Sequence, residues 1–218
     1  AFRIPGTEDM DKEYKECWHH IRGAFIGIGI GLVVALLAGL YEQTSGTIEF
    51  SNSQKPSVGY TLQKTRLFND SIEYNIRLDR KDIPEANINW ALDIACCDFI
   101  RSLDTKLSEG GKNLSGGQRQ RLGIARAIVT KPEIIILDDA SASLDAITEK
   151  KFINNLSNVD YDLTKIIISQ KIKSVKSCDK ILVLDDGKLI CQGTHEELLS
   201  KSDIYLDMYK LQTREAES

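Results

Sequence analysis

The stretch "LSGGQRQRLGIARAI", Leu114 to Ile128, begins with two adjacent glycines and continues with apolar residues at helical spacing. This periodicity predicts a helix that starts at the glycines. Ser115, Gly116 and Gly117 would then lie at the helix N-terminus, where a hydroxyl, bare backbone amides and the positive end of the helix dipole suit a phosphate group. "SGG" alone is better explained as an ordinary glycine turn before an amphipathic helix, so its meaning depends on the rest of the chain.

A second stretch, "IIILDDASASLD" from Ile134 to Asp145, ends a buried apolar run in a pair of aspartates. Four apolar residues in succession predict a buried strand, which brings Asp138 to its carboxyl end. A carboxylate at that edge can hold magnesium directly or through water. Taken alone, an acidic pair after a strand also fits the N-cap of a following helix.

Together the two stretches resemble the signature and Walker B motifs of ATP-binding cassette (ABC) transporter domains. "SEGG" precedes the "LSGGQ" of the signature and "QRQR" ends it, which makes chance similarity remote. "VGYTLQKTRLFNDSIEYNI" is similar to the Q-loop segment of exporter-type members, and "KIIISQ" with "DKILVLDDGKLICQGTHEELL" is similar to their switch strand and closing hairpin. The resemblance extends from Phe2 to about Gln212.

The resemblance implies an α/β fold: a P-loop NTPase (RecA-like) core with a mostly parallel sheet, and an α-helical signature subdomain. Residues 1–66 and 130–218 are expected to form the ATP-binding core, and residues 67–129 the helical subdomain that carries "LSGGQ". We therefore expect two parts with different architecture in one chain.

The apolar patterns favour the same architecture. Short strand-like runs alternate with helical patterns, which predicts a largely parallel sheet covered on both faces. These runs are Thr47–Phe50, Ser57–Tyr60, Glu133–Leu137, Lys165–Ser169 and Lys180–Leu184. Residues 68–130 are helix-periodic without a convincing strand. Thr194 and Glu197 have capping-box spacing, which predicts that one or two surface helices follow.

In this family two domains pair head to tail, and each ATP lies between the Walker motifs of one chain and the signature of the other. The resemblance therefore implies ATP and Mg²⁺ as cofactors, ATPase activity within a dimer, and a weak or inactive isolated chain. A transmembrane domain is the other expected partner, which places the chain at the cytoplasmic face of a membrane. Asp138 and Gln63 correspond to magnesium-binding positions, and Asp139 and Gln170 to catalytic positions. The implied cofactor-binding positions are Gly27, Gly29, Gly31, Gln63, Leu114, Ser115, Gly116, Gly117, Gln118 and Asp145.

The expected phosphate-binding loop departs from the family pattern. In "RGAFIGIGIGLVVALLAGLYEQTSG", a predicted strand (Phe25–Ile28) and helix (Leu32–Leu40) flank three glycines. The lysine and hydroxyl of a G-x-x-x-x-G-K-[ST] loop are absent. Counting back from the helix puts Ile30 at the lysine position and Gly31 at the hydroxyl position, whereas counting forward from the strand suggests that about six loop residues are missing. Both alignments lose the lysine.

Three further departures concern catalysis and adenine binding. Asp139 replaces the usual glutamate and is one methylene shorter, so it is poorly placed to polarise an attacking water. Gln170 replaces the switch histidine and can bond to a phosphate without carrying a positive charge. Ile4 occupies the place of the aromatic residue that stacks on adenine. The aspartate and glutamine resemble the non-hydrolysing half of heterodimeric exporters, in which one composite site is degenerate.

Composition limits the other classes of function. The chain has 218 residues and a formal net charge of -4, with acids and bases interspersed, so no basic footprint for nucleic acid is present. Five cysteines without C-x-x-C spacing suggest neither a disulfide framework nor a zinc site. The uncharged stretch Gly23–Tyr41 approaches the length of a membrane helix, but its glycines favour a turn. The opening "AFRIPGTED" resembles the end of a strand and predicts that the natural polypeptide begins earlier.

Two alternatives to the ATPase interpretation remain from the sequence. A regulatory or scaffold module would keep the ABC fold without handling nucleotide. A dinucleotide-binding enzyme is disfavoured, because "GIGIG" has the spacing G-x-G-x-G rather than G-x-G-x-x-G. The transported substrate is not encoded in this segment, since the membrane helices that select it are absent from the sequence.

Overall fold

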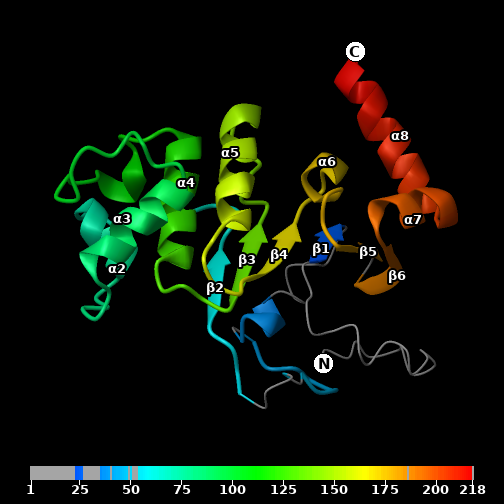
Figure 1. The fold of residues 1–218 in the computed structure, drawn as a ribbon, viewed down its shortest axis with the longest axis horizontal. Coiled ribbons are helices and arrows are strands. Elements are labelled where there is room, and N and C mark those ends of the chain that lie inside the picture. Colours follow the sequence, from blue (N-terminus) through cyan, green and yellow to red (C-terminus); the bar gives the residue numbers. More distant parts are fainter. Residues whose placement is uncertain are drawn as a thin grey trace. The chain divides into compact units, whose positions relative to one another are not determined.

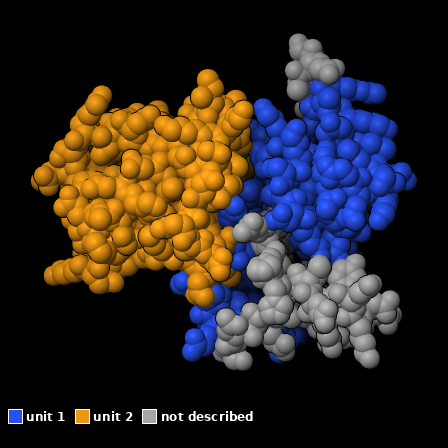
Figure 2. Space-filling view, in the orientation of Figure 1, with its two compact units in different colours: residues 1–57, 164–218 blue, residues 58–163 orange. Residues whose placement is uncertain are grey.

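The structure is a computed structural model that describes residues 23–26, 35–39, 41–48, 50, 54–185 and 187–217. The chain divides into two compact units (Figure 2). Unit 1 contains residues 1–57 and 164–218, and unit 2 contains residues 58–163. Each unit has strands and helices of its own, and each is described separately below.

The sheet of unit 1 has four strands in the order β4, β1, β5, β6 (Figure 1). Their bounds are β1 Gly23–Ile26, β4 Thr164–Ile168, β5 Lys180–Asp185 and β6 Lys188–Gly193. Strand β1 runs parallel to β4 and β5, and β6 returns antiparallel to β5. Gly187 in the β5–β6 turn has a φ of 72°, a left-handed conformation that glycine adopts without strain.

Helices α6 (Ile172–Val175), α7 (His195–Lys201) and α8 (Asp203–Glu217) accompany this sheet, and residues 35–37 of the described part are helical as well. The side chain of Thr194 accepts a hydrogen bond from the backbone nitrogen of Glu197, and the Glu197 carboxylate accepts one from the backbone nitrogen of Thr194. The predicted capping box therefore starts α7. Helices α7 and α8 pack on an apolar core, in which the Tyr205 ring is fully buried.

Unit 2 is built on a parallel strand pair, β2 (Val58–Thr61) and β3 (Ile134–Asp138), in which Tyr60 lies opposite Ile136. Helix α4 (Gly116–Ile128) packs directly on β2, because a Cβ atom at Gly59 would collide with the Ala127 carbonyl. Buried isoleucines and leucines fill the unit, namely Ile72, Ile76, Ile88, Leu122, Ile124, Ile128, Ile135 and Ile136.

The remaining helices of unit 2 are α2 (Ile72–Arg77), α3 (Glu85–Ile94), the short 3₁₀ helix η3 (Glu109–Gly111) and α5 (Ala146–Ser157). The periodic pattern of the α3 region continues well beyond this helix. Cys96 has a φ of 56°, which a helix cannot contain, so α3 ends just before it. Residues 68–130 contain helices and one isolated bridge, Ser71 to Lys106.

The predicted α/β class with a mostly parallel sheet is confirmed. Four predicted strands match β2, β3, β4 and β5 to within one residue at each end. The strand predicted at Thr47–Phe50 is reduced to one bridge residue, Ile48, in the part that the structure describes. The strand predicted at Phe25–Ile28 corresponds to β1, with residues 27 and 28 outside the described residues, as are residues 32–34 and 40 of the predicted helix. Over the described ranges, every helix is too short or too polar to cross a membrane.

Candidate nucleotide-binding site

Asp138 lies at the carboxyl end of β3, as the sequence predicts. The Tyr60 hydroxyl on the neighbouring strand β2 donates a hydrogen bond of 3.0 Å to Asp138 Oδ2. Burial raises the pKa of the Asp138 carboxyl, the Tyr60 bond lowers it, and the adjacent Asp139 charge raises it again. Burial, with the Asp138 charge second, raises the pKa of Tyr60 to about 12, so this hydroxyl remains a donor at neutral pH.

Asp139 follows with a φ of 47°, a conformation that turns the chain sharply after the strand. Its Oδ2 atom accepts a long hydrogen bond of 3.4 Å from Gln63 Nε2. Gln63 comes from the segment after β2, so two predicted site residues that are 76 positions apart meet here. The structure thereby brings Gln63, Asp138 and Asp139 to one edge of unit 2.

The signature forms the start of α4. Ser115 is its N-cap: its hydroxyl oxygen accepts from the Gln118 backbone nitrogen at 3.2 Å, and Gln118 Oε1 accepts from the Ser115 nitrogen at 2.9 Å. Ser115 and Gly116 are exposed, and a Cβ atom at Gly116 would have no neighbour within 4 Å. Because the Ser115 oxygen accepts in the cap, its hydrogen remains available to a ligand. Leu114, just before the cap, is half-buried.

Gly117 is constrained by the turn that follows β3. A Cβ atom at Gly117 would lie 2.8 Å from the Ser143 carbonyl oxygen, so only glycine lets the two backbones approach. Two residues later, Asp145 caps α5, and its Oδ1 atom accepts from the backbone nitrogens of Ile147 and Thr148 at 3.1 and 3.0 Å. Its Oδ2 atom accepts from the Thr148 hydroxyl at 2.7 Å. Both oxygens of this predicted cofactor-binding residue are therefore bonded within its own helix cap.

Helix α4 also holds the backbone on either side of Gln63. The Gln120 side chain donates to the Leu62 carbonyl at 3.1 Å and accepts from the Thr65 hydroxyl at 3.1 Å. Gln120 is almost completely buried, with 3% of its surface exposed. One side chain of the signature helix is therefore bonded to residues on both sides of Gln63.

The other predicted residues lie elsewhere. Gln170 follows β4 in unit 1, and its side chain is exposed. Gly27, Gly29 and Gly31 lie outside the described residues. Within the described ranges, no three histidine, cysteine or acidic side chains gather closely enough to hold a metal ion by themselves. A magnesium ion at Asp138 and Gln63 would take its remaining ligands from water or from phosphate oxygens.

Comparison with known proteins identifies the family. The family model described as ABC transporter matches residues 25–142, more than half of the chain. The chain belongs to the ABC transporter family. Members of this family bind ATP, generally with Mg²⁺, and are generally ATPases. The predicted resemblance is thus confirmed at the level of an ABC nucleotide-binding domain.

Individual relatives are similar to this ABC domain over most of its length. The putative ABC transporter ATP-binding protein MG014 of Mycoplasma genitalium is 37% identical over an alignment of 210 residues, and the match covers 85% of this chain and 34% of that protein. ATP-binding cassette sub-family B member 6 of Rattus norvegicus is 34% identical over 206 residues, with 88% of this chain and 25% of that protein covered. The structure of a bacterial Atm1-family ABC exporter with ATP bound matches with a TM-score of 0.80 and 34% identity, over 88% of this chain and 36% of that one. The chain spans about a third or a quarter of the curated relatives' length.

Two residues that support the site were missed by the sequence analysis. Tyr60 donates a hydrogen bond to Asp138, and Gln120 bonds to the backbone before Gln63 and to the Thr65 side chain after it. Both residues lie inside the quoted motif segments, but neither was given a chemical role. Tyr60 could have been found from the strand pattern, because pairing β2 with β3 in parallel puts its side chain near the end of β3. Gln120 carried a weaker signal, since it is a polar residue at an otherwise buried position of α4.

Proposed function

We propose that this ABC domain belongs to an exporter and pairs head to tail with a second ABC domain at the cytoplasmic face of a membrane. ATP binding and hydrolysis at the domain interface would drive a transmembrane domain. In this pair the Walker site of the present chain is degenerate, and its signature completes the ATP site of the partner. Similarity to an Atm1-family exporter and to a sub-family B protein supports the exporter assignment.

The observation that carries the proposal is the contrast between the signature and the other motifs. Ser115 and Gly116 are exposed at the start of a well-capped helix, as a signature that closes over phosphate requires. The Walker A lysine is absent, and Asp139 and Gln170 stand where glutamate and histidine are usual. A chain with this combination can serve its partner's site better than its own.

Mg²⁺ fits the oxygen donors of Asp138 and Gln63. Tyr60 donates to Asp138 Oδ2, and Gln63 Nε2 donates to Asp139, so the Asp138 carboxylate and Gln63 Oε1 would supply oxygens to the ion or its waters. Bound magnesium would neutralise charge on the nucleotide phosphates. Asp139 accepts a hydrogen bond from Gln63, and its short side chain places it poorly to polarise an attacking water.

The test replaces signature residues in the assembled pair. Ser115→Arg or Gly116→Asp should abolish ATP hydrolysis, because each puts bulk, and the aspartate also like charge, where the partner's γ-phosphate must lie. Asp139→Asn should reduce hydrolysis much less, since Asp139 belongs to the degenerate site. The measurement is ATP hydrolysis by the reconstituted pair with each substitution singly.

The structure offers a control for misfolding. The space around Gly116 is open, so the Gly116→Asp side chain fits without a clash and this variant should keep the parental stability in urea denaturation. If the Ser115→Arg and Gly116→Asp pairs hydrolyse ATP at the parental rate, this chain completes no partner site. The alternative of a regulatory or scaffold module, which the missing lysine favours, would then replace the proposal.

A further inference from the structure

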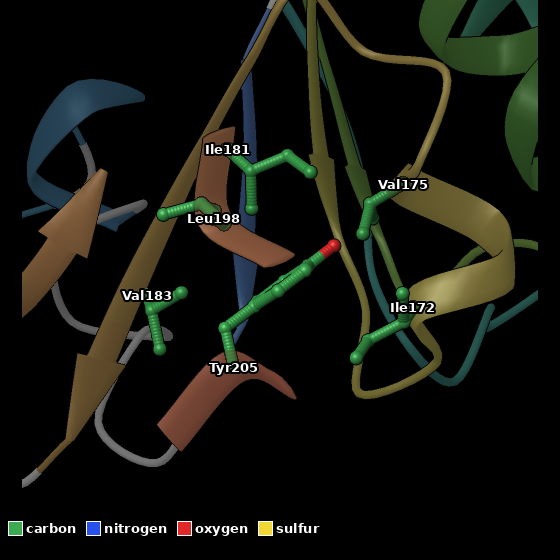
Figure 3. Packing of buried hydrophobic residues seen from close by; sticks show 6 residues of the cluster. All are labelled: Ile172, Val175, Ile181, Val183, Leu198 and Tyr205. Atoms are coloured by element: carbon green, nitrogen blue, oxygen red, sulfur yellow. The ribbon is translucent and has the colours of Figure 1, made fainter. Parts of the chain in front are cut away.

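The C-terminal helix α8 packs against the segment that follows Gln170. The Tyr205 ring reaches from α8 into the apolar core of unit 1, between Ile181 and Val183 of β5 and Ile172 and Val175 of α6 (Figure 3). Tyr205 and Val175 have no exposed surface, and Ile172 has 1%. The first turn of α6 is therefore fixed to α8 by a close-packed apolar contact.

A second contact lies two turns further along α8. Gln212 Oε1 accepts a hydrogen bond of 2.9 Å from the Ile172 backbone nitrogen, and Gln212 Nε2 donates one of 2.8 Å to the Gln170 carbonyl. Met208 and Tyr209 also pack on this core, so the residues at positions 205, 208, 209 and 212 form one face of the helix. A single side-chain amide thus bonds to the two backbone groups that flank Lys171, as a neighbouring strand would.

The backbone around Gln170 is held on its other side as well. The Ser169 hydroxyl oxygen accepts from the Lys171 backbone nitrogen at 3.0 Å, and Ser169 is buried, with 3% of its surface exposed. The Gln170 side chain, in contrast, is exposed. This arrangement fixes the backbone that carries Gln170 and leaves its amide group available to a ligand.

We propose that Gln212 is a positioning residue for Gln170, so that α8 determines where the Gln170 amide points. The inference rests on the proposed function and extends it, because Gln170 at the switch position would then bond to the γ-phosphate of ATP at this chain's own site. Gln212 touches no nucleotide itself and acts only through the backbone of residues 170–172. Displacement of α8 would release this segment.

The structural part of the test uses amide hydrogen exchange in the assembled transporter. Gln212→Met keeps the side-chain length and helix propensity but removes both polar atoms. The amide of Ile172 should then exchange about tenfold faster, as expected when one hydrogen bond of ordinary strength is lost. Lys210→Met is the matched control, because Lys210 is exposed on the same helix. Unchanged exchange at Ile172 in the Gln212→Met protein would overturn the proposal.

The functional part measures how strongly this chain's site prefers ATP to ADP, by displacement of a trinitrophenyl nucleotide from a dimer whose partner lacks its Walker A lysine. Gln170→Ala should lower the preference several-fold, because it removes the group that bonds to the γ-phosphate. Gln212→Met should lower it in the parental background and cause no further loss when combined with Gln170→Ala.

The outcomes separate the two hypotheses. If the protein with both Gln170→Ala and Gln212→Met prefers ATP to ADP even less than Gln170→Ala alone, Gln212 stabilises the domain generally. That result would overturn its positioning role. If Gln170→Ala leaves the preference unchanged while Gln212→Met still accelerates exchange at Ile172, the phosphate-binding role of Gln170 in the proposed function is wrong. The contact between α8 and the segment would then be structural only, and the positioning proposal fails with it.

Discussion

At the scale of single residues, the Asp138 carboxyl depends on one side-chain donor, the Tyr60 hydroxyl. The carboxyl is partly removed from water and has a second carboxylate next to it, and both conditions disfavour its charged form. The Tyr60 bond opposes them, because it stabilises the charged form. A residue to which the sequence analysis gave no role thereby supports a predicted metal ligand.

Tyr60→Phe should lower the free energy of unfolding by about 1 kcal/mol, the value of a hydrogen bond to a charged group reduced by partial solvent screening. Urea denaturation measures this change. Tyr74→Phe is the matched control, because the Tyr74 hydroxyl makes an exposed bond of 3.4 Å to Asp79 and its loss should have no measurable effect. Equal stability of the Tyr60→Phe protein and the parent would show that the bond contributes nothing.

The residues that the sequence could predict differ in kind from those that it could not. Asp138, Asp139 and Gln63 stand beside strands or within recognisable motifs, so local pattern was enough to select them. Gln120 and Gln212 act through bonds to backbone groups about 40 or more positions away. Such bonds depend on how elements pack, and a glutamine in an amphipathic helix looks like any surface residue until that packing is known.

At the scale of elements, α4 connects the signature to the Q-loop by direct packing. A Cβ atom at Gly123 would collide with the Thr65 hydroxyl, and the same side chain bonds to Gln120. Between the helix and the Thr65 side chain there is therefore no room for a Cβ atom. This close contact, together with the bonds of Gln120, joins the signature helix to the segment that carries Gln63.

Gly123→Ala tests how tight this contact is. In open space the change would stabilise a helix interior by about 1 kcal/mol, because alanine has the higher propensity. Here the collision with Thr65 should reverse the sign and destabilise the domain by about 1 to 3 kcal/mol. Gly116→Ala, at the first position of the same helix and with no neighbour near its Cβ, should leave stability unchanged or raise it slightly. Thermal or urea unfolding of both variants measures these changes. A Gly123→Ala protein more stable than the parent would show that the contact between Gly123 and Thr65 is not tight.

The cap of α5 predicts a pH dependence. Backbone and side-chain hydrogen bonds from Thr148 hold the pKa of Asp145 below its ordinary value. A lowered pKa means that the folded state prefers the carboxylate, so its contribution is complete above the ordinary pKa of about 3.9 and is lost as pH falls through the lowered value. Asp145→Ala should therefore destabilise the domain at pH 7 and progressively less below about pH 4. Asp145→Asn keeps a capping oxygen and should destabilise less than Asp145→Ala at pH 7; melting temperatures across this range are the measurement.

At the scale of the whole molecule, the fold class was predictable because strand-like runs alternate with helical patterns along most of the chain. β2, β3, β4 and β5 were located to within one residue at each end. The end of α3 was not predictable, since apolar periodicity continues past Cys96 and only the backbone conformation there stops the helix. The strand predicted at Thr47–Phe50 has suitable residues, but a strand also needs a neighbour to pair with, and one bridge at Ile48 is all that its described residues form.

The distribution of motifs over the molecule leads to a prediction about repair. Asp139→Glu combined with Gln170→His restores the side chains that family members use to handle water and the γ-phosphate. Phosphoryl transfer depends mainly on holding the phosphates in line with the attacking water, and the lysine that holds the β- and γ-phosphates is absent from this chain. A charge-assisted bond to phosphate contributes roughly 1.5 to 3 kcal/mol, so its loss weakens ATP binding by about ten- to a hundredfold. The double variant should therefore remain inactive at its own site.

The measurement is ATP turnover in the assembled pair with the partner's catalytic glutamate disabled, so that only this chain's site can react. Appreciable turnover would mean that residues 27–34 hold the phosphates without a lysine, and the signature would then no longer be this chain's main contribution to catalysis.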